Sequence, residues 1–220
     1  YNTAYANCTT ELIICIDSDD YMAENAVEKI LSFWDNYGSS KFSGLVGLDA
    51  DFDENIIGKE FPEGLSSSTL EDLYEIHQIP GDKKLVYRTE IVKKYPPYPS
   101  FAGENFVPHG SLFIQIDQDY ELLLLNEVLV NVEYQQDGPT RNMFRQYRRH
   151  PQGWEFGRLT AINHTKYFKN RFRNMIHLVS TRIQLKKFNI FRGHQHPVLA
   201  IAALPFGFIL YFYIRYKNRN

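Results

Sequence analysis

Cysteine is scarce in this sequence, and repeats and biased tracts are absent. The chain of 220 residues has two cysteines, Cys8 and Cys15, which are too few for a disulfide framework and have no metal-ligand spacing. No internal repeat or low-complexity tract occurs, so the composition indicates neither a solenoid nor a disordered segment. With 44% hydrophobic and 23% charged residues, the chain has the composition of a globular protein.

Acidic residues are nearly absent from the last third of the chain. Residues 1–140 contain 8 Lys and Arg against 25 Asp and Glu, whereas residues 141–220 contain 16 against 1. An acidic part can hold a cation, and a basic part attracts phosphate, nucleic acid or an anionic bilayer. The change in composition predicts an acidic domain over 1–140, a basic helical region over 141–196 and an apolar helix over 197–220.

Short apolar runs alternate with helical spacing in residues 1–140. Strands are predicted at 12–16, 42–48, 85–88 and within 119–132. Helices are predicted at 23–34 and after a capping box formed by Ser68 and Glu71, and a helical turn at 90–94. This alternation predicts an α/β fold with a parallel or mixed sheet.

An acidic turn, Asp17-Ser18-Asp19-Asp20, ends the first predicted strand. Ligands of open α/β sheets bind beyond the carboxyl ends of the strands. Asp17 and Asp19 are expected on the same side, where their oxygens could share one Mg²⁺ or Mn²⁺ that bridges a diphosphate. The alternative is that Asp17 and Asp20 cap a helix beginning near Ala23. For Asp20 both interpretations stay open.

A second acidic cluster, residues 49–60, has part of the spacing of a calcium-binding EF-hand loop. Glu54 stands where that loop needs glycine, and the flanking residues have strand character. A solvated hairpin is therefore the favoured interpretation.

Several motifs occur in one order along the chain. They are Asn2-Thr3-Ala4, Glu11 to Asp20, Gly47 to Gly58, Tyr87-Arg88-Thr89, Gly103-Glu104-Asn105-Phe106-Val107-Pro108 and Glu133 to Gly138. With this ordered set, the chain resembles family 2 glycosyltransferases of the GT-A fold that build bacterial capsule or wall polysaccharides. The resemblance implies a GT-A-like (Rossmann-like) mixed sheet with flanking helices, and it gives Asp17 and Asp19 the metal-binding and diphosphate-binding roles.

The resemblance also implies an acceptor site. In the corresponding motif, related glycosyltransferases often have Glu-Asp where this chain has Glu104-Asn105. Glu104 is therefore the expected catalytic base or acceptor-orienting residue. His109 stands where related sequences often carry Glu. It is either a base, a ligand of a sugar or phosphate, or an ordinary loop histidine. The other expected substrate contacts are Asn2, Asp20, Arg88, Gln136 and Asp137, although Asp137-Gly138-Pro139 is equally typical of a simple turn.

By this resemblance the chain is expected to transfer a sugar from a nucleotide-diphosphate sugar to a glycan or lipid-linked acceptor. The transfer is expected to be inverting and to depend on Mn²⁺ or Mg²⁺. Enzymes of this type begin with a βαβ unit that binds the nucleotide, and no such unit precedes Tyr1, so the domain is expected to be truncated at its N-terminus. The alternative function is a non-catalytic, membrane-associated remnant or sugar-binding module of the same fold.

Basic residues interleaved with aromatic ones in 141–187 are compatible with nucleic acid or with a membrane surface. The acidic part of the chain would repel a polyanion, and no nucleic-acid module is recognisable, so no nucleic-acid partner is expected.

An apolar run at 198–214 precedes basic residues, but at 17 residues it is shorter than the roughly 20 of a spanning helix. An interfacial helix is favoured over a span, and a buried packing helix is the alternative. The expected location is cytoplasmic, at the inner face of the cell membrane.

Overall fold

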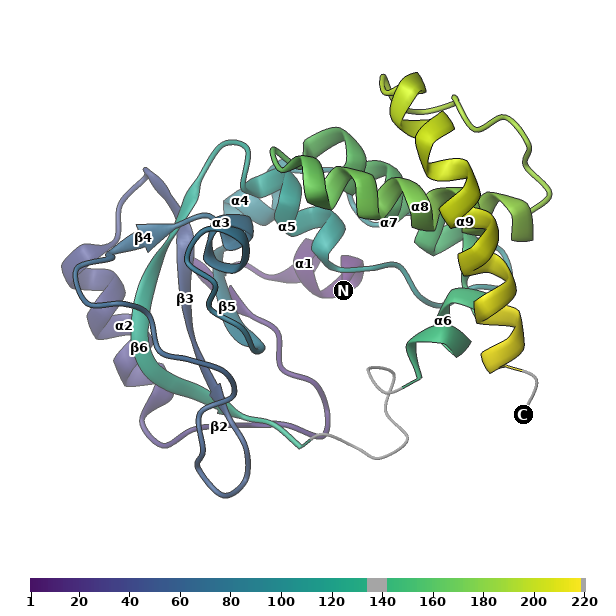
Figure 1. Cartoon of the computed structure of the whole chain (residues 1–220). Coiled ribbons are helices and arrows are strands. Elements are labelled where there is room, and N and C mark those ends of the chain that lie inside the picture. Colours follow the sequence, from purple (N-terminus) through teal and green to yellow (C-terminus); the bar gives the residue numbers. More distant parts are fainter. Residues whose placement is uncertain (134–141, 219–220) are drawn as a thin grey trace. The chain divides into compact units, whose positions relative to one another are not determined.

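The computed structural model describes residues 1–133 and 142–218 (Figure 1). The chain forms two compact units. Unit 1 comprises residues 1–97 and 116–135, and unit 2 comprises residues 98–115 and 136–220. Unit 1 therefore ends close to the predicted boundary at residue 140, while residues 98–115, which were assigned to the first domain, belong to unit 2.

Unit 1 contains a six-stranded mixed sheet. Its strands are β1 (Leu12–Ile14), β2 (Tyr21–Met22), β3 (Phe42–Ala50), β4 (Ser67–Ser68), β5 (Lys83–Arg88) and β6 (Glu121–Asn131). The order is β1-β5-β3-β6-β2, and β4 pairs with β6 beside this path. Strands β3 and β6 are parallel, and the other pairs are antiparallel. The predicted α/β class with a mixed sheet is confirmed.

Strand β3 lies at the centre of the sheet and is buried from Ser43 to Ala50. Its neighbour β5 approaches it closely at Gly44, where an added Cβ atom would lie 2.0 Å from the carbonyl oxygen of Val86. Because a strand buried on both faces has no solvent side, it need not alternate apolar and polar residues, and here Leu45, Val46 and Leu48 lie among small residues. This explains why the sequence shows a clear strand signal at this position.

The helices of unit 1 are α1 (Asn2–Asn7), α2 (Ala26–Tyr37), α3 (Leu70–Glu75) and α4 (Thr89–Lys94). Figure 1 shows α2 beside the sheet. Helix α2 buries Ala26, Ile30 and Trp34 in a core that includes Leu45 and Leu129. The helix predicted at 23–34 is confirmed, although it begins later.

The capping box predicted for α3 is wrong by one residue. Thr69, not Ser68, is the N-cap, and its side chain accepts the backbone N–H of Asp72. Two further N–H groups of the first turn are satisfied from a distant part of the chain, because the carboxylate of Asp117 accepts the N–H groups of Leu70 and Glu71. Burial raises the pKa of Asp117 to about 6, although both N–H groups oppose this shift.

The helices that follow are α5 (Gly110–Ile116), α6 (Met143–Arg149), α7 (Pro151–His164), α8 (Phe168–Gln184) and α9 (Pro197–Lys217). The predicted basic helical region and the apolar helix are thus confirmed as helices. Unit 2 has its own core, formed by Ile162 of α7, Met175 and Leu178 of α8, and Ala200 and Ala203 of α9. Of the described residues, only α9 forms a helix that is long and apolar enough to cross a membrane, judged by length and composition.

Candidate active site at the carboxyl edge of the sheet

Strand direction gathers acidic residues at one edge of the sheet in unit 1. Strands β1, β3 and β6 run the same way, because β5 is antiparallel to both β1 and β3, and β6 is parallel to β3. Their carboxyl ends therefore share an edge with the first residues of β2 and β5. We call this edge the acidic edge. The carboxylates on it are those of Asp17, Asp19, Asp20, Asp49 and Asp82.

The predicted acidic turn is present between β1 and β2. The backbone N–H of Asp20 donates to the carbonyl oxygen of Asp17 over 3.1 Å, and the carboxylates of Asp17 and Asp19 are exposed. The interpretation as a helix cap is wrong, because β2 follows the turn and α2 begins only at Ala26, with Asn25 as its N-cap. The turn therefore leaves two exposed carboxylates beyond the end of β1, where a ligand of an α/β sheet would bind.

Tyr1 contacts this turn through its hydroxyl, which donates to Oδ1 of Asp17 over 3.4 Å. Partial burial and the nearby Asp17 carboxylate raise the pKa of Tyr1 to about 12. Asn2, a predicted substrate contact, is the next residue and is the first of α1. The structure thus brings the start of α1 to the acidic turn.

Asp20 is partly buried, and its Oδ1 atom accepts no hydrogen bond from the described residues. Burial raises the pKa of Asp20 above its ordinary value, and Lys84 partly opposes this shift. The neighbouring carboxylates of Asp19 and Asp17 contribute smaller increases. Since a buried oxygen without a partner is costly, Asp20 has an acceptor position available for a ligand.

Asp49 is a further candidate residue that the sequence did not indicate. It was assigned to a solvated turn, but it lies in β3, is only 2% exposed, and has an Oδ1 atom without a partner among the described residues. Burial raises the pKa of Asp49 to about 6; Lys84 opposes the shift, while Asp82 and Asp20 add to it. The available signal was a carboxylate at the end of a strand buried on both faces.

The turn after β3 is a hairpin, as predicted. Oδ1 of Asp51 accepts the backbone N–H groups of Asp53 and Asn55 over 3.0 and 2.9 Å, and Ala50 forms a β-bridge with Ile56. These hydrogen bonds lower the pKa of Asp51. The EF-hand spacing therefore reflects a local turn, in which the side chain of Asp51 accepts hydrogen bonds from backbone N–H groups.

Arg88 lies at the far end of β5 from the acidic edge. Its guanidinium donates to the carbonyl oxygens of Ser40 and Phe42 over 3.2 and 3.1 Å and forms an ion pair with Glu90. These contacts join the start of β3 to the start of α4. The structure therefore does not bring Arg88 together with Asp17 and Asp19. The guanidinium of Arg88 instead stabilises the backbone at the start of β3.

Glu104 lies in unit 2, where its carboxylate meets the first turn of α7. Oε1 accepts the backbone N–H and the side-chain amide of Gln152 over 2.9 and 3.2 Å. Oε2 accepts the backbone N–H of Gly153 over 2.9 Å. A carboxylate at a helix N-terminus satisfies free N–H groups and interacts favourably with the helix dipole. Because a carboxylate has about four acceptor positions, one position on Oε2 stays open.

The segment that carries Glu104 packs on a glycine face of α7. A Cβ atom at Gly153 would lie 2.1 Å from the carbonyl oxygen of Phe106, and one at Gly157 would lie 2.8 Å from Cγ of Pro108. The two glycines, four residues apart on α7, allow the segment to lie directly on the helix backbone. Glu104 is thereby held in one place.

His109 belongs to an aromatic cluster in unit 2, formed by Tyr98, Phe106, His109, His150 and Trp154. The ring centroid of His109 lies 5.6 Å from that of Tyr98 and 6.5 Å from that of Phe106. Nε1 of Trp154 is buried without a partner among the described residues. The structure therefore places Glu104 and His109 in one segment beside aromatic rings. Gln136 and Asp137 lie outside the described residues.

No family model matches the chain, and no curated protein matches it. Two solved structures are similar, both of S. aureus TarS 1–349, one in complex with UDP-GlcNAc and one with UDP. They have TM-scores of 0.46 and 0.44 and 13% sequence identity, and they cover 93% and 99% of this chain. The chain spans 59% of the first of these and 66% of the second.

Proposed function

We propose that this chain is the metal-binding and acceptor-binding part of an inverting glycosyltransferase in cell-surface polysaccharide synthesis. It would move a sugar from a nucleotide-diphosphate sugar to a glycan or lipid-linked acceptor. The observation that carries this proposal is the acidic edge, where the Asp17 to Asp20 turn follows β1 and the buried Asp49 lies near the end of β3, a strand that runs the same way as β1. The ordered glycosyltransferase-like motifs of the sequence support it.

A divalent cation fits the chemistry of the acidic edge, because carboxylate oxygens are the ligands that Mg²⁺ and Mn²⁺ prefer. Asp17 and Asp19 would hold it. Within the described ranges, no three His, Cys, Asp or Glu side chains form a group that could hold a metal ion, so diphosphate oxygens of the donor would complete its ligands. When bound, the cation would offset the negative charge of the leaving diphosphate.

Asp20 and Asp49 would act beside that position. Each has a buried Oδ1 atom without a partner in the described part of the chain, and such an oxygen can accept a hydrogen bond from a hydroxyl group of the donor. The raised pKa of Asp49, caused mainly by burial, means that it takes up a proton more readily than an exposed aspartate. We assign both residues to donor binding.

Glu104 would act on the acceptor. As the acceptor oxygen attacks the anomeric carbon, its proton would pass to the open position on Oε2, and the nucleoside diphosphate would leave with the electron pair of the broken bond. The hydrogen bonds from Gln152 and Gly153 fix the carboxylate, and the nearby rings of Phe106 and His109 offer apolar faces to a sugar. Asn2, Gln136 and Asp137 would complete the substrate contacts.

A second candidate function is a non-catalytic sugar-binding module of the same fold. The observation that favours it is the role of Glu104 as a cap of α7, because three hydrogen bonds already occupy its carboxylate. Such a module would bind the nucleotide sugar at the acidic edge without turning it over.

Binding of Mn²⁺ in the presence of a nucleoside diphosphate tests the proposed site. Titration of the chain with Mn²⁺ and UDP, followed by electron paramagnetic resonance, should show a bound ion whose affinity falls at least tenfold in Asp19→Asn. The matched control is Asp53→Asn, because Asp53 is an exposed acid of the neighbouring hairpin. Equal binding in wild type and Asp19→Asn would refute the metal assignment.

Turnover separates the two candidate functions. Incubation with Mn²⁺ and a panel of nucleotide-diphosphate sugars should release nucleoside diphosphate, and Asp19→Asn should abolish this release. Binding of the same sugars without any release in the wild-type chain would instead support the non-catalytic module.

A further inference from the structure

Helix α9 presents its large apolar side chains to solvent. The residues it buries are mostly small, with Ala200, Ala203 and Gly207 packed toward α8. Its exposed apolar residues are large: Val198, Ile201, Phe206, Phe208, Ile209, Phe212, Tyr213 and Tyr216. Ile209 and Phe212 are 68% and 63% exposed. A helix that packs on the core of a soluble protein buries its large apolar residues and exposes polar ones. The exposed apolar face of α9 therefore indicates an apolar partner.

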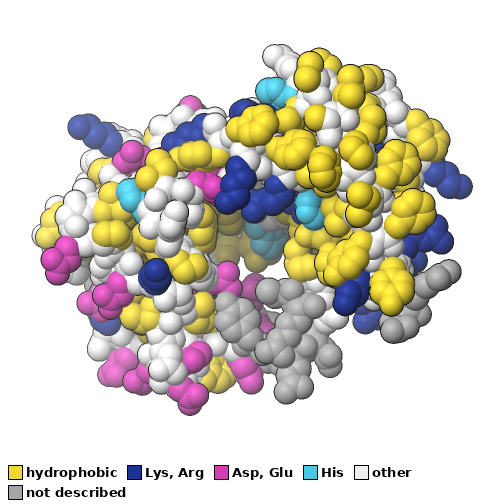
Figure 2. All heavy atoms as spheres, viewed as in Figure 1, with side chains coloured by type: hydrophobic (Ala, Val, Ile, Leu, Met, Phe, Trp, Pro, Cys, Tyr) yellow, Lys and Arg dark blue, Asp and Glu magenta, His cyan; other side chains and the backbone are white. Residues whose placement is uncertain are grey.

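Figure 2 shows hydrophobic side chains gathered over α9, with Lys and Arg side chains near one end of the helix. With 21 residues, α9 is about 32 Å long. This length would suffice to cross a bilayer, but the packing of unit 2 opposes a crossing. Gly207 lies against Val179 of α8, and Phe206 packs on Phe172 of the same helix.

A crossing would draw α8 into the hydrocarbon with α9. Helix α8 carries Lys169, Arg171, Arg173 and Arg182, with Asn174 among its buried residues. Each charge at the centre of a bilayer costs several kcal/mol, of order 3 on insertion scales. An orientation in the plane of the membrane surface, with only the large apolar face inserted, avoids this cost.

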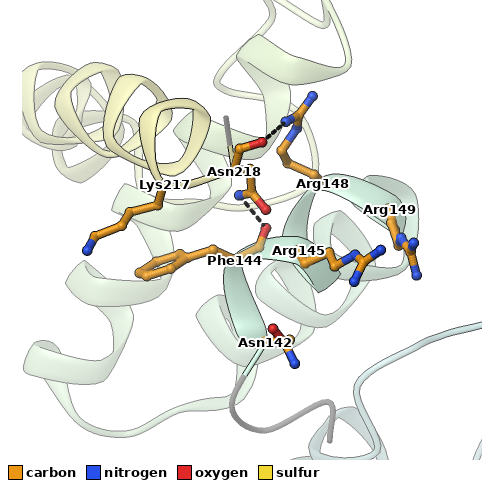
Figure 3. Close-up of a pocket in the computed structure, with 7 residues that line it drawn as sticks. All are labelled: Asn142, Phe144, Arg145, Arg148, Arg149, Lys217 and Asn218. Atoms are coloured by element: carbon orange, nitrogen blue, oxygen red, sulfur yellow. Dashed lines mark hydrogen bonds between the residues drawn. The ribbon is translucent and has the colours of Figure 1, made fainter. Parts of the chain in front are cut away.

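A basic pocket lies at the C-terminal end of α9. It has a volume of about 620 Å³ and is lined by Asn142, Phe144, Arg145, Arg148, Arg149, Lys217 and Asn218. Figure 3 shows that the three arginines come from the α6 side and Lys217 from α9. Asn218 ties the two sides together, because its side-chain amide donates to the carbonyl oxygen of Phe144 and its own carbonyl oxygen accepts from Arg148.

The four cations of this pocket have no carboxylate partner among the described residues. The described part of unit 2 contains two acidic side chains, Glu104 and Glu155. Glu104 caps α7, and Glu155 pairs with Arg182 and Lys187. The pocket therefore keeps its positive charge and favours an anionic ligand.

The pocket is continuous with the apolar face of α9. Phe144, which lines the pocket, packs against Tyr213 of the exposed face with ring centroids 5.5 Å apart. A group bound in the pocket would thus be anionic, and it would lie beside a surface that prefers hydrocarbon. An anionic phospholipid has both properties in one molecule.

We propose that the basic pocket between α6 and α9 binds the headgroup phosphate of an anionic phospholipid while the large apolar face of α9 inserts into the same leaflet. The site anchors unit 2 to the membrane surface. It uses Arg145, Arg149 and Lys217 as phosphate ligands, and it does not depend on the proposed sugar transfer.

Sedimentation with vesicles tests this site at about 0.15 M salt, where distant surface charges are screened. Wild-type protein should bind vesicles of phosphatidylglycerol and phosphatidylcholine at least tenfold more strongly than vesicles of phosphatidylcholine alone. The triple variant Arg145→Gln, Arg149→Gln, Lys217→Gln should lose about fivefold in partitioning for each cation removed, or roughly a hundredfold in total. Phe212→Ser should weaken binding to both kinds of vesicle.

The matched control is Lys166→Gln, Lys169→Gln, Arg192→Gln, which removes the same charge from exposed positions of unit 2 that do not line the pocket. It should keep most of the wild-type binding, and circular dichroism should show both triple variants folded. An equal loss in the control would overturn the pocket as the site. So would unchanged binding in the pocket variant, or binding of inorganic phosphate in the pocket without any association with vesicles.

Discussion

The carboxylate of Glu104 accepts the backbone N–H of Gly153 over 2.9 Å, so the residue proposed as the catalytic base is also the cap of helix α7. The two roles make different demands on the side chain. A cap needs an acceptor oxygen, which an amide also has, whereas a base needs an ionisable carboxylate. The substitution by glutamine therefore separates them.

Glu104→Gln should keep one acceptor oxygen at the start of α7 and lose about 1 kcal/mol of stability. Sugar transfer should slow by roughly 10²–10⁴-fold, because no carboxylate is left to take the acceptor proton. Denaturant unfolding and initial transfer rates, measured on the same preparation, give both quantities. A normal rate in a stable Glu104→Gln variant would show that Glu104 is a cap and nothing more.

Gly153→Ala should destabilise unit 2, because the new Cβ atom would lie 2.1 Å from the carbonyl oxygen of Phe106. Backbone atoms cannot move aside as a flexible side chain can, so we expect a cost of about 1–3 kcal/mol. Gly110→Ala is the control, since a Cβ atom there meets nothing within 4 Å. Equal unfolding free energies for the two variants would contradict the close approach of residues 106–108 to α7.

The sequence was sufficient for the strands that carry the site. At β1 and β3, strand propensity and a following acidic turn agree, and β6 has a run of Leu residues that is typical of a buried strand. From them the position of Asp17 to Asp20 beyond a strand end was predicted correctly. These features are local in sequence, which is why they could be read without the structure.

The features that the sequence did not reveal depend on distant residues. Asp49 is buried in β3, whose neighbours β5 and β6 come from distant parts of the chain, and the α3 cap needs Asp117, which is 46 residues away from Glu71. Likewise, the contact of Glu104 with Gly153 spans 49 positions. No local pattern encodes such contacts, because they arise only when elements pack.

Asp49→Asn should change how stability depends on pH. The pKa of Asp49 is raised to about 6, mainly by burial, so the folded state holds its proton more tightly than the unfolded state does. Stability from this group is therefore present below its ordinary pKa of 3.8 and is lost as pH rises to about 6. The asparagine variant, which has no charge to bury, should be more stable than wild type at pH 7 by roughly 1–3 kcal/mol and similar to it at pH 4.

Denaturant unfolding of both proteins from pH 4 to pH 8 measures this difference directly. Taking the difference between variant and wild type removes the contribution of other groups, such as His177, whose pKa is lowered to about 3 by burial and by Arg158 and Arg173. Asp53→Asn makes the same substitution at an exposed position and is the control. A less stable Asp49→Asn variant at pH 7 would show that the buried charge is compensated, with Lys84 as its partner.

Glu155 forms an ion pair with Arg182. Among the described residues of unit 2, Arg182 is the most deeply buried cation that has a carboxylate partner. The Oε1 atom of Glu155 accepts a hydrogen bond from Nε–H of Arg182 over 3.0 Å, and the Arg182 side chain is only 4% exposed. The guanidinium also donates to the carbonyl oxygens of Asn189 and Arg192, so it is fixed in place. Oε2 pairs with Lys187, whose side chain is 51% exposed.

Glu155→Gln should therefore cost about 3–5 kcal/mol of unfolding free energy, because it leaves the Arg182 charge buried without a counter-charge. Lys187→Gln removes a partner of the same carboxylate, but Lys187 is half exposed, so its loss should cost at most about 1 kcal/mol. Urea unfolding followed by tryptophan fluorescence reports on this unit through Trp154 of α7. A cost for Glu155→Gln no larger than that for Lys187→Gln would mean that solvent reaches Arg182 and that its charge needs no partner.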